Sequence, residues 1–225
     1  MYFRTIEDPA EAALTYLVAD TAEQEAVVID PLTGQSELIR ALLDERDLRL
    51  RFVLRTHVHR PDRHACDELC RHTGARLVVG AQAACRSAQR RAAHGETLVF
   101  GSQVLRVLAT PGHTPGCVSY LWRDRLFCGD AFDVGGCRAG NREADAGKLF
   151  DSLTERIFLL PGETLLFPAH FLKGRTVTTI AEERRRHARL GAASREAFVT
   201  EMAFRGRARI EPGVAGEDEL PGAGS

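Results

Sequence analysis

The chain has 225 residues, of which 44% are hydrophobic and 27% charged, so it suits one globular domain and is neither fibrous nor wholly disordered. Its apolar runs are too short for a transmembrane helix, and its N-terminus lacks the basic and apolar regions of a signal peptide. The formal net charge of -1 gives no indication of a nucleic-acid or membrane partner. Lys148 and Lys173 are the only lysines, and the arginine excess is typical of a GC-rich genome. We therefore expect a cytoplasmic, bacterial protein, with a homodimer as a compatible assembly.

The first half of the sequence predicts strands that alternate with helices. Apolar residues at helical spacing, such as Leu38, Leu42 and Leu43, mark the first helix, and Asp30-Pro31 signals a turn after a strand. The expected elements are strands at 14–18 and 25–29, a helix at 36–47, a strand at 50–54, a helix at 61–73 and a strand at 76–80.

The second half begins with four strands joined by tight turns, at 96–100, 103–109, 117–122 and 125–128. A helix at 148–159, a strand at 164–168 and a charged helix at 177–190 follow, and residues 211–225 are rich in Gly, Pro and acidic residues. Hairpins and helices in both halves predict two mainly antiparallel or mixed sheets that pack together, with helices outside.

Four histidines and one aspartate follow predicted strands and are flanked by Gly or Pro. They are His57, His59, His113, His170 and Asp130. Loops at strand ends are where a rigid scaffold places functional groups. Imidazole and carboxylate ligands suit zinc or ferrous iron, so this constellation predicts a metal site. The six cysteines show no zinc-site spacing, and we expect them to be reduced core or surface residues.

These residues stand in motifs that resemble a known family. The motifs are T-H-x-H at 56–59, T-P-G-H-T at 110–114, G-D at 129–130 and P-A-H at 168–170. In this order they resemble the metallo-β-lactamase superfamily, and most closely its persulfide dioxygenase (sulfur dioxygenase) branch, which is related to the glyoxalase II hydrolases. The resemblance covers residues from about Tyr2 to about Phe204. It implies an α/β fold, an αββα sandwich, with one domain at 1–205 and a flexible C-terminal tail at 206–225.

The resemblance also implies a cofactor and roles for the motif residues. Residues His57, His113 and Asp130 match the family's iron ligands, which implies one Fe²⁺ per chain, with zinc as a substitute. Two histidines and one carboxylate leave positions open for a sulfur substrate and O₂. His59 and His170 match catalytic positions that orient ligands or contact water on the substrate side. Either one could equally have a structural role.

The sequence departs from the family where hydrolases bind a second metal. Pro61 stands in place of the Asp of T-H-x-H-x-D-H, and Asp62 in place of its last His. Proline can neither bind a metal nor accept a proton, so a two-metal hydrolytic site is impaired. Asp62 and His64 could substitute for the lost ligands, but we expect them to be solvated or helix-capping groups.

Further departures fall on the substrate side. In the segment 138–141 only Arg138 keeps a family residue, and Phe171 stands where the family has Asp. Arg189 matches a family arginine that contacts a glutathione carboxylate, and a guanidinium can bind a carboxylate through two hydrogen bonds. Arg138 and Arg189 are therefore the candidate substrate-binding residues, although Arg189 lies on an arginine-rich helix and could be merely solvated.

The leading hypothesis is a mononuclear non-haem iron dioxygenase that oxidises a small persulfide, such as glutathione persulfide, with O₂ and releases sulfite. The first alternative is a glyoxalase II-like, metal-dependent hydrolase of thioesters, against which Pro61 argues. The second is a non-catalytic metal-binding or thiol-binding module that retains the fold. No cysteine is assigned to catalysis in any of these hypotheses.

Overall fold

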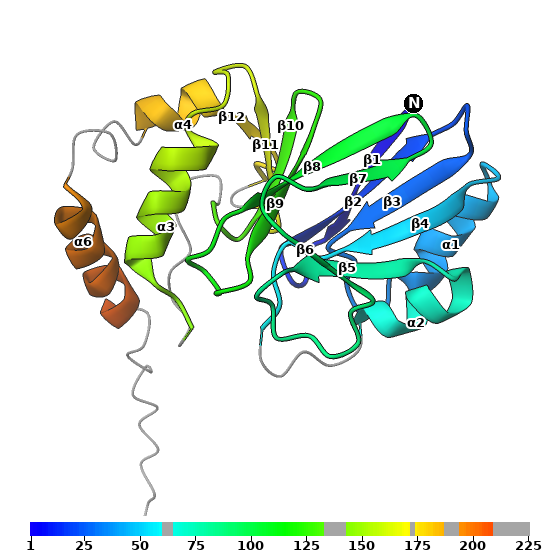
Figure 1. Ribbon diagram of the computed structural model, residues 1–225, viewed down its shortest axis with the longest axis horizontal. Coiled ribbons are helices and arrows are strands. Elements are labelled where there is room, and N and C mark those ends of the chain that lie inside the picture. Colours follow the sequence, from blue (N-terminus) through cyan, green and yellow to red (C-terminus); the bar gives the residue numbers. More distant parts are fainter. Residues whose placement is uncertain (60–64, 133–142, 172–173, 187–193, 209–225) are drawn as a thin grey trace, which may run out of the picture.

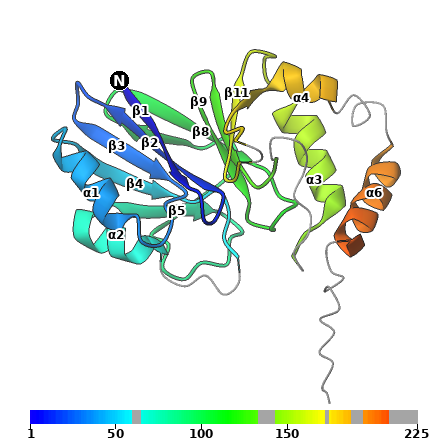
Figure 2. The ribbon, with the colours of Figure 1, turned by 180° about the vertical axis from the view of Figure 1, so that it is seen from behind.

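The protein is described by a computed structural model that covers residues 1–59, 65–132, 143–171, 174–186 and 194–208. Two mixed or antiparallel sheets stack face to face, and helices cover both outer faces (Figures 1 and 2). The predicted αββα sandwich is confirmed.

Each sheet of the described chain has six strands. The first contains, in spatial order, β1 (Tyr2–Asp8), β2 (Ala13–Asp20), β3 (Glu25–Ile29), β4 (Arg49–Leu54), β5 (Arg76–Gly80) and β6 (Arg90–Ala92). The second contains, in spatial order, β12 (Thr178–Thr179), β11 (Leu165–Pro168), β10 (Arg125–Gly129), β9 (Val118–Trp122), β8 (Gln103–Ala109) and β7 (Thr97–Phe100). Strands β3 to β6 are parallel to one another, as are β10 and β11, so several carboxyl-terminal strand ends meet at one edge of the sandwich.

The helices bury their apolar faces on the outer sides of the sheets. The first sheet is covered by α1 (Ser36–Asp44) and α2 (Ala65–Thr73), and the second by α3 (Ala146–Ser152), its π-helical continuation η1 (Leu153–Ile157) and α4 (Ile180–Arg186). Helix α6 (Arg195–Ala208) packs against α3. Ile39, Leu42 and Leu43 of α1 lie at helical spacing and are buried against the first sheet. Phe198 and Met202 of α6 are buried in the cluster that covers the second sheet.

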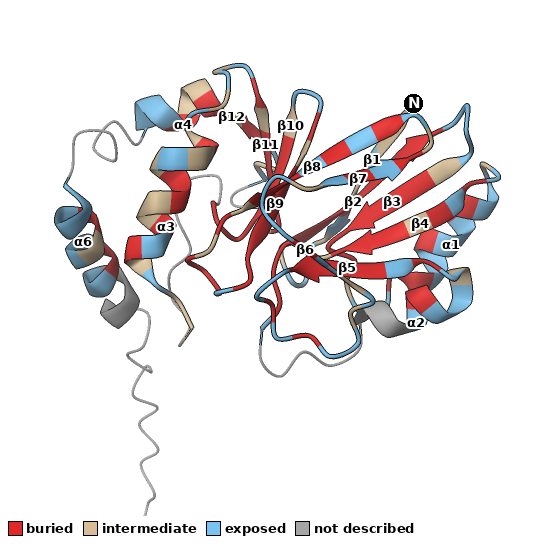
Figure 3. Ribbon diagram, viewed as in Figure 1, coloured by how far each residue is buried: buried red, intermediate tan, exposed pale blue. Residues whose placement is uncertain are grey.

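The core between the sheets is apolar and rich in aromatic residues (Figure 3). Tyr16 of β2 and Phe127 of β10 are almost fully buried, and their ring centroids lie 5.1 Å apart. The Tyr16 hydroxyl donates a hydrogen bond to the carbonyl oxygen of Pro168 at 2.5 Å. This bond joins the first sheet to β11 close to His170, so it ties the core to the edge where the candidate ligands lie.

Most predicted elements are found close to their expected bounds. The strands at 25–29, 76–80 and 103–109 are confirmed residue for residue, and the helix predicted at 148–159 divides into α3 and η1. Four elements were not predicted, namely β1, β6, β12 and α6. Thr178 and Thr179, predicted to be helical, form β12, because they pair with Leu166 and Leu165 of β11.

Several predicted segments extend beyond the described chain. The helix expected at 61–73 is described only from Ala65, and residues 187–190 of the helix expected at 177–190 lie outside the described chain. Residues 206–208 of the expected tail belong to α6, and residues 209–225 lie outside the described chain. No helix within the described ranges is long and apolar enough to span a membrane.

Replacing Tyr16 by Phe should destabilise the protein, because it leaves the Pro168 carbonyl without this buried donor. The expected loss in the free energy of unfolding is about 1 to 3 kcal/mol. Tyr2→Phe is the matched control, since the Tyr2 hydroxyl is buried and has no hydrogen-bond partner among the described residues. Urea unfolding of both variants checks the prediction, and equal stability of Tyr16→Phe and the wild type would contradict it.

Candidate metal centre

The candidate ligands converge at one edge of the sandwich because each of them follows the end of a strand. His57 and His59 follow β4, and His113 lies in the loop between β8 and β9. Asp130 follows β10, and His170 comes two residues after the end of β11. Both sheets contribute, so the packing of one sheet on the other determines the distances between these side chains.

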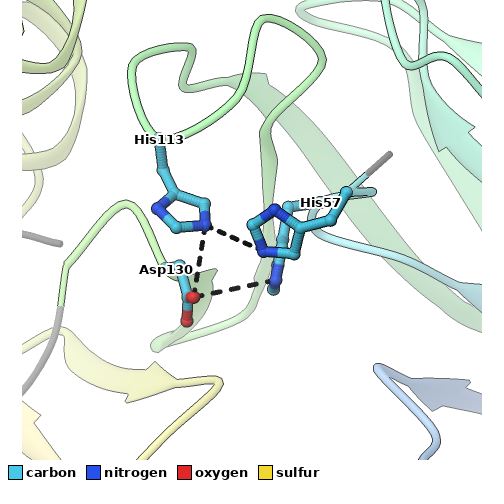
Figure 4. Close-up of side chains that lie close together, drawn as sticks. His57, His113 and Asp130 are labelled. Carbon is cyan, nitrogen blue, oxygen red and sulfur yellow. Dashed lines mark hydrogen bonds and ion pairs between the residues drawn. The ribbon is translucent and has the colours of Figure 1, made fainter. Parts of the chain in front are cut away.

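Four of the five predicted side chains form one cluster. One ligand atom from each of His57, His59, His113 and Asp130 lies within 4.8 Å of the others. The Asp130 Oδ2 atom is 3.3 Å from His113 Nε2 and 3.7 Å from His57 Nε2, and Figure 4 shows the carboxylate beside both rings. His59 Nε2 lies 3.1 Å from His113 Nε2. Three imidazole nitrogens and a carboxylate oxygen that face one another are a donor set that fits a transition-metal ion.

His170 contacts the cluster through the carboxylate rather than joining the group of facing nitrogens. Its Nδ1 atom lies 2.7 Å from Asp130 Oδ1, the oxygen that does not face His57 and His113. The backbone on either side of His170 is held by the start of β2 and the residue before it, because Leu14 N–H donates to Ala169 O and Phe171 N–H donates to Ala12 O. His170 therefore fixes the orientation of the Asp130 carboxylate.

The electrostatics of the cluster favour the protonation states that bind a metal. Burial alone would raise the pKa of Asp130, but the His170 hydrogen bond and the nearby His57, His170 and His113 rings outweigh it and lower that pKa. Burial lowers the pKa of His57 to about 3 and also lowers the pKa of His59. At neutral pH Asp130 is therefore charged and His57 is neutral, as metal ligands must be.

The loop that carries His113 is anchored by α3 and η1. Arg156 of η1 donates to the carbonyl oxygen of Ala109 at 2.6 Å, and the Ser152 hydroxyl donates to that of Pro111 at 2.7 Å. Gly112 has a φ of +146°, and a Cβ atom there would lie 2.4 Å from the Cα atom of Leu149. Only glycine allows this approach, so the T-P-G-H motif needs Gly112 to pack the loop against α3.

Thr56 and Asp30, which were not predicted to belong to the site, hold the Nδ1 side of the His57 ring. The Thr56 hydroxyl lies 2.9 Å from His57 Nδ1 and donates to Asp30 Oδ2 at 2.6 Å. The Thr56 backbone N–H donates to Asp30 Oδ1 at 2.8 Å. Gly129 packs so closely that a Cβ atom there would lie 2.2 Å from the Thr56 hydroxyl oxygen. The sequence signal for Asp30 was its place as a polar residue directly after the apolar strand β3.

A cavity of about 270 Å³ opens beside the cluster. Val58 and Thr114, which neighbour ligand residues in the chain, contribute to its wall together with Ala83 and Glu143. The walls combine small apolar side chains with the polar side chains of Gln82, Thr114 and Glu143, so the cavity can hold part of a small organic molecule.

Several predicted residues lie outside the described chain. These are the altered residues Pro61 and Asp62, the proposed substitute ligand His64, and the substrate-binding candidates Arg138 and Arg189. Phe171 is described, and its side chain packs against the core between the sheets. The described cysteines Cys70, Cys85, Cys117 and Cys128 are buried, and burial raises the pKa of Cys117 to about 11, so this thiol stays protonated.

Comparison with known families agrees with this geometry. The model of the metallo-β-lactamase superfamily matches residues 9–170, a range that contains all five candidate side chains. The chain belongs to the metallo-β-lactamase superfamily. Its predicted resemblance to this superfamily and to the persulfide dioxygenase branch is therefore confirmed, and the cluster supports a metal cofactor.

Individual relatives differ in how much of the chain they match. The mitochondrial persulfide dioxygenase ETHE1 of Homo sapiens is 36% identical over 211 residues, which cover 88% of this chain and 79% of that protein. The crystal structure of ETHE1 from Myxococcus xanthus has a TM-score of 0.85 at 40% identity and covers 95% of this chain and 93% of that one. A hydroxyacylglutathione hydrolase-like protein of Homo sapiens is 38% identical over 162 residues, covering 69% of this chain and 54% of that protein.

The lowered pKa of His57 predicts that the metal-free protein loses stability in acid. The folded-state pKa is about 3 and the ordinary value is 6.5, so the unfolded chain takes up the proton first as the pH falls. Stability is then lost from about pH 6.5 downwards, by up to about 1.4 kcal/mol per pH unit. Between pH 7 and pH 5 the wild type should lose about 2 kcal/mol more than the His57→Asn variant.

Urea unfolding of the metal-free proteins at the two pH values measures this difference. His72→Asn is the control, because His72 is exposed on α2 and the variant should lose as much stability as the wild type. An identical loss in the wild type and His57→Asn would show that His57 does not remain neutral in the folded state.

Proposed function

We propose that the protein is a persulfide dioxygenase, an oxidoreductase that uses O₂ to oxidise the terminal sulfur of a small persulfide. The observation that carries this proposal is the extent of the similarity to the persulfide dioxygenases. It spans 211 residues and reaches well beyond the superfamily match at 9–170, whereas the similarity to the hydrolase-like protein spans 162 residues.

The proposed cofactor is one Fe²⁺ per chain, held by His57, His113 and Asp130, with zinc as a substitute. The buried Asp130 carboxylate supplies negative charge against the cation, and the facing nitrogens of His57 and His113 supply lone pairs. When bound, ferrous iron brings a sulfur ligand and O₂ together and allows electrons to pass between them. This donor set with positions left for substrate is typical of non-haem iron oxygenases.

The proposed reaction converts a persulfide, O₂ and water into a thiol, sulfite and two protons. The terminal sulfur loses four electrons to O₂, and its bond to the inner sulfur breaks. His170 holds the Asp130 carboxylate through the 2.7 Å contact, which keeps the other carboxylate oxygen directed at His57 and His113. His59 is the exposed member of the cluster, and we propose that it contacts the substrate side and accepts a proton there.

The proposed substrate is glutathione persulfide or a related small persulfide. Arg138 and Arg189 are the proposed contacts for its carboxylates, on the strength of the family resemblance alone. The cavity at Val58, Ala83 and Thr114 could hold the organic part of such a molecule. We further propose a bacterial, cytoplasmic protein without nucleic-acid or membrane partners, for which a homodimer is a compatible assembly.

The second candidate is a glyoxalase II-like thioester hydrolase, supported by the hydrolase-like relative. In that case His59 would bind the first metal, and His170 would bind a second metal. The loss of the Asp and His ligands at Pro61 and Asp62 argues against it.

Oxygen consumption separates the candidates. Protein loaded anaerobically with Fe²⁺ should consume O₂ when glutathione persulfide is added and should produce one sulfite per O₂. The comparison is hydrolysis of a glutathione thioester by protein loaded with zinc. Brisk thioester hydrolysis without O₂ consumption would overturn the proposal in favour of the hydrolase, and no turnover of either substrate would favour the binding module.

Replacing Asp130 by Ala should remove nearly all of the bound metal, because the variant loses a ligand and the charge that balances the cation. Metal content per chain, measured after loading with Fe²⁺ and removal of free metal, should fall from about one to nearly zero. Asp124→Ala is the control, since this exposed aspartate lies in the turn between β9 and β10 and should leave the metal content unchanged. Full occupancy in Asp130→Ala would refute the ligand assignment.

A further inference from the structure

His57 makes a close polar contact through each of its two ring nitrogens. Nε2 lies 3.7 Å from the Asp130 carboxylate inside the cluster, and Nδ1 lies 2.9 Å from the Thr56 hydroxyl outside it. A neutral imidazole has one N–H and one lone pair, so only one of its two tautomers presents a lone pair to a metal from Nε2. The group that contacts Nδ1 decides which tautomer is populated.

The Thr56 hydroxyl has a single proton, which it donates in a hydrogen bond to the Asp30 carboxylate. The distance from the hydroxyl oxygen to Asp30 Oδ2 is 2.6 Å, and the other carboxylate oxygen accepts the Thr56 backbone N–H. A carboxylate is only an acceptor, so the hydroxyl must donate to Asp30 and can offer only a lone pair to His57. The ring must then donate through Nδ1–H, which leaves the Nε2 lone pair free.

Asp30 is held in this position by its backbone and by a cation. Its φ of +49° is a left-handed conformation that Asp tolerates better than most residues, and its backbone N–H donates to Leu54 O at 2.8 Å. Burial raises the pKa of Asp30, and the nearby Arg55 guanidinium and the two Thr56 hydrogen bonds oppose this shift. The Arg55 Nε atom lies 3.9 Å from Asp30 Oδ1, and its positive charge favours the ionised carboxylate.

Gly129, at the end of β10 in the second sheet, packs closely against Thr56. A Cβ atom at this position would lie 2.2 Å from the Thr56 hydroxyl oxygen and 2.5 Å from its Cβ atom. Thr56 is 1% exposed, so water does not compete for its hydroxyl. Both partners of that hydroxyl therefore belong to the protein, and an ionised Asp30 carboxylate fixes the direction of both hydrogen bonds.

We propose that Asp30 and Thr56 are positioning residues for the metal centre. They hold His57 in the tautomer with the proton on Nδ1, so that Nε2 is ready to bind the metal before the metal arrives. The inference rests on the proposed metal site and is independent of the reaction performed there. An outer hydrogen-bond partner of this kind typically contributes a 10- to 100-fold gain in metal affinity.

Thr56→Val and Thr56→Ser test the proposal as a pair. Valine has nearly the shape of threonine but no hydroxyl, whereas serine keeps the hydroxyl. Zinc affinity, measured by competition with a chromophoric chelator, should fall roughly 10- to 100-fold in Thr56→Val. It should stay within about threefold of the wild type in Thr56→Ser, on the same scale of effects. Unchanged affinity in Thr56→Val, or an equal loss in both variants, would overturn the proposal.

Thr178→Val is the control for a purely structural effect. Thr178 is also buried and its hydroxyl also donates to a carboxylate, that of Glu183 at 2.7 Å, but it lies on β12 and contacts no ligand residue in the described chain. Its zinc affinity should match that of the wild type even if its stability falls. A loss of affinity equal to that of Thr56→Val would show that the effect is general destabilisation.

The tautomer can also be measured in the unmodified protein, which keeps the proposal testable if Thr56→Val does not fold. In the metal-free wild type at pH 7, ¹⁵N chemical shifts should show His57 protonated at Nδ1 and not at Nε2. A ring protonated at Nε2 would overturn the proposal. Zinc affinity and the tautomer do not depend on persulfide oxidation, so failure of the proposed reaction would leave both results interpretable.

Discussion

The arrangement of the site depends on one buried negative charge, the carboxylate of Asp130. Moving a carboxylate from water into a protein interior costs several kcal/mol unless it is paired and hydrogen-bonded. Here one oxygen contacts His170 and the other faces His57 and His113. The three rings come from three different strand ends, so both sheets must be packed before this carboxylate is satisfied. A bound cation would balance the charge of this carboxylate.

The hydrogen bonds that hold the cluster residues in place come from both halves of the sandwich. The first sheet holds His57 through Thr56 and Asp30. The helical layer on the second sheet holds the His113 loop through Arg156 and Ser152. Because each ligand is fixed by its own local contacts, the distances among the ligands depend mainly on how the apolar faces of the two sheets pack together. A perturbation of the aromatic core should therefore change the metal centre without touching any ligand.

Much of this arrangement could be predicted from the sequence, because buried strands such as Glu25–Ile29 have short apolar runs and turn signals. The clustering of the candidate ligands His57, His59, His113 and Asp130 could be anticipated because these residues stand in motifs that follow strand ends. Strand β1 was not, since only Ile6 of its seven residues is buried, and β6 was not, since its three residues Arg-Arg-Ala are defined by pairing with β5. The support of His57 by Asp30 could not be predicted either, because 26 residues separate Asp30 from Thr56 and only the parallel pairing of β3 with β4 brings them together.

The close packing of Gly129 on Thr56 has a consequence for how this sequence can change over evolutionary time. Gly129 ends β10 of the second sheet, and Thr56, 73 residues earlier in the chain, follows β4 of the first. The space available to one side chain is nevertheless set by the other. Adding a methyl group at 129 would require removing atoms at 56, and the hydroxyl at 56 is the atom that the methyl would displace. The pair is therefore expected to show epistasis, because a residue larger than glycine at 129 is harmful as long as threonine occupies position 56. Directed evolution of this scaffold would make faster progress with both positions held constant while the wall of the cavity is varied.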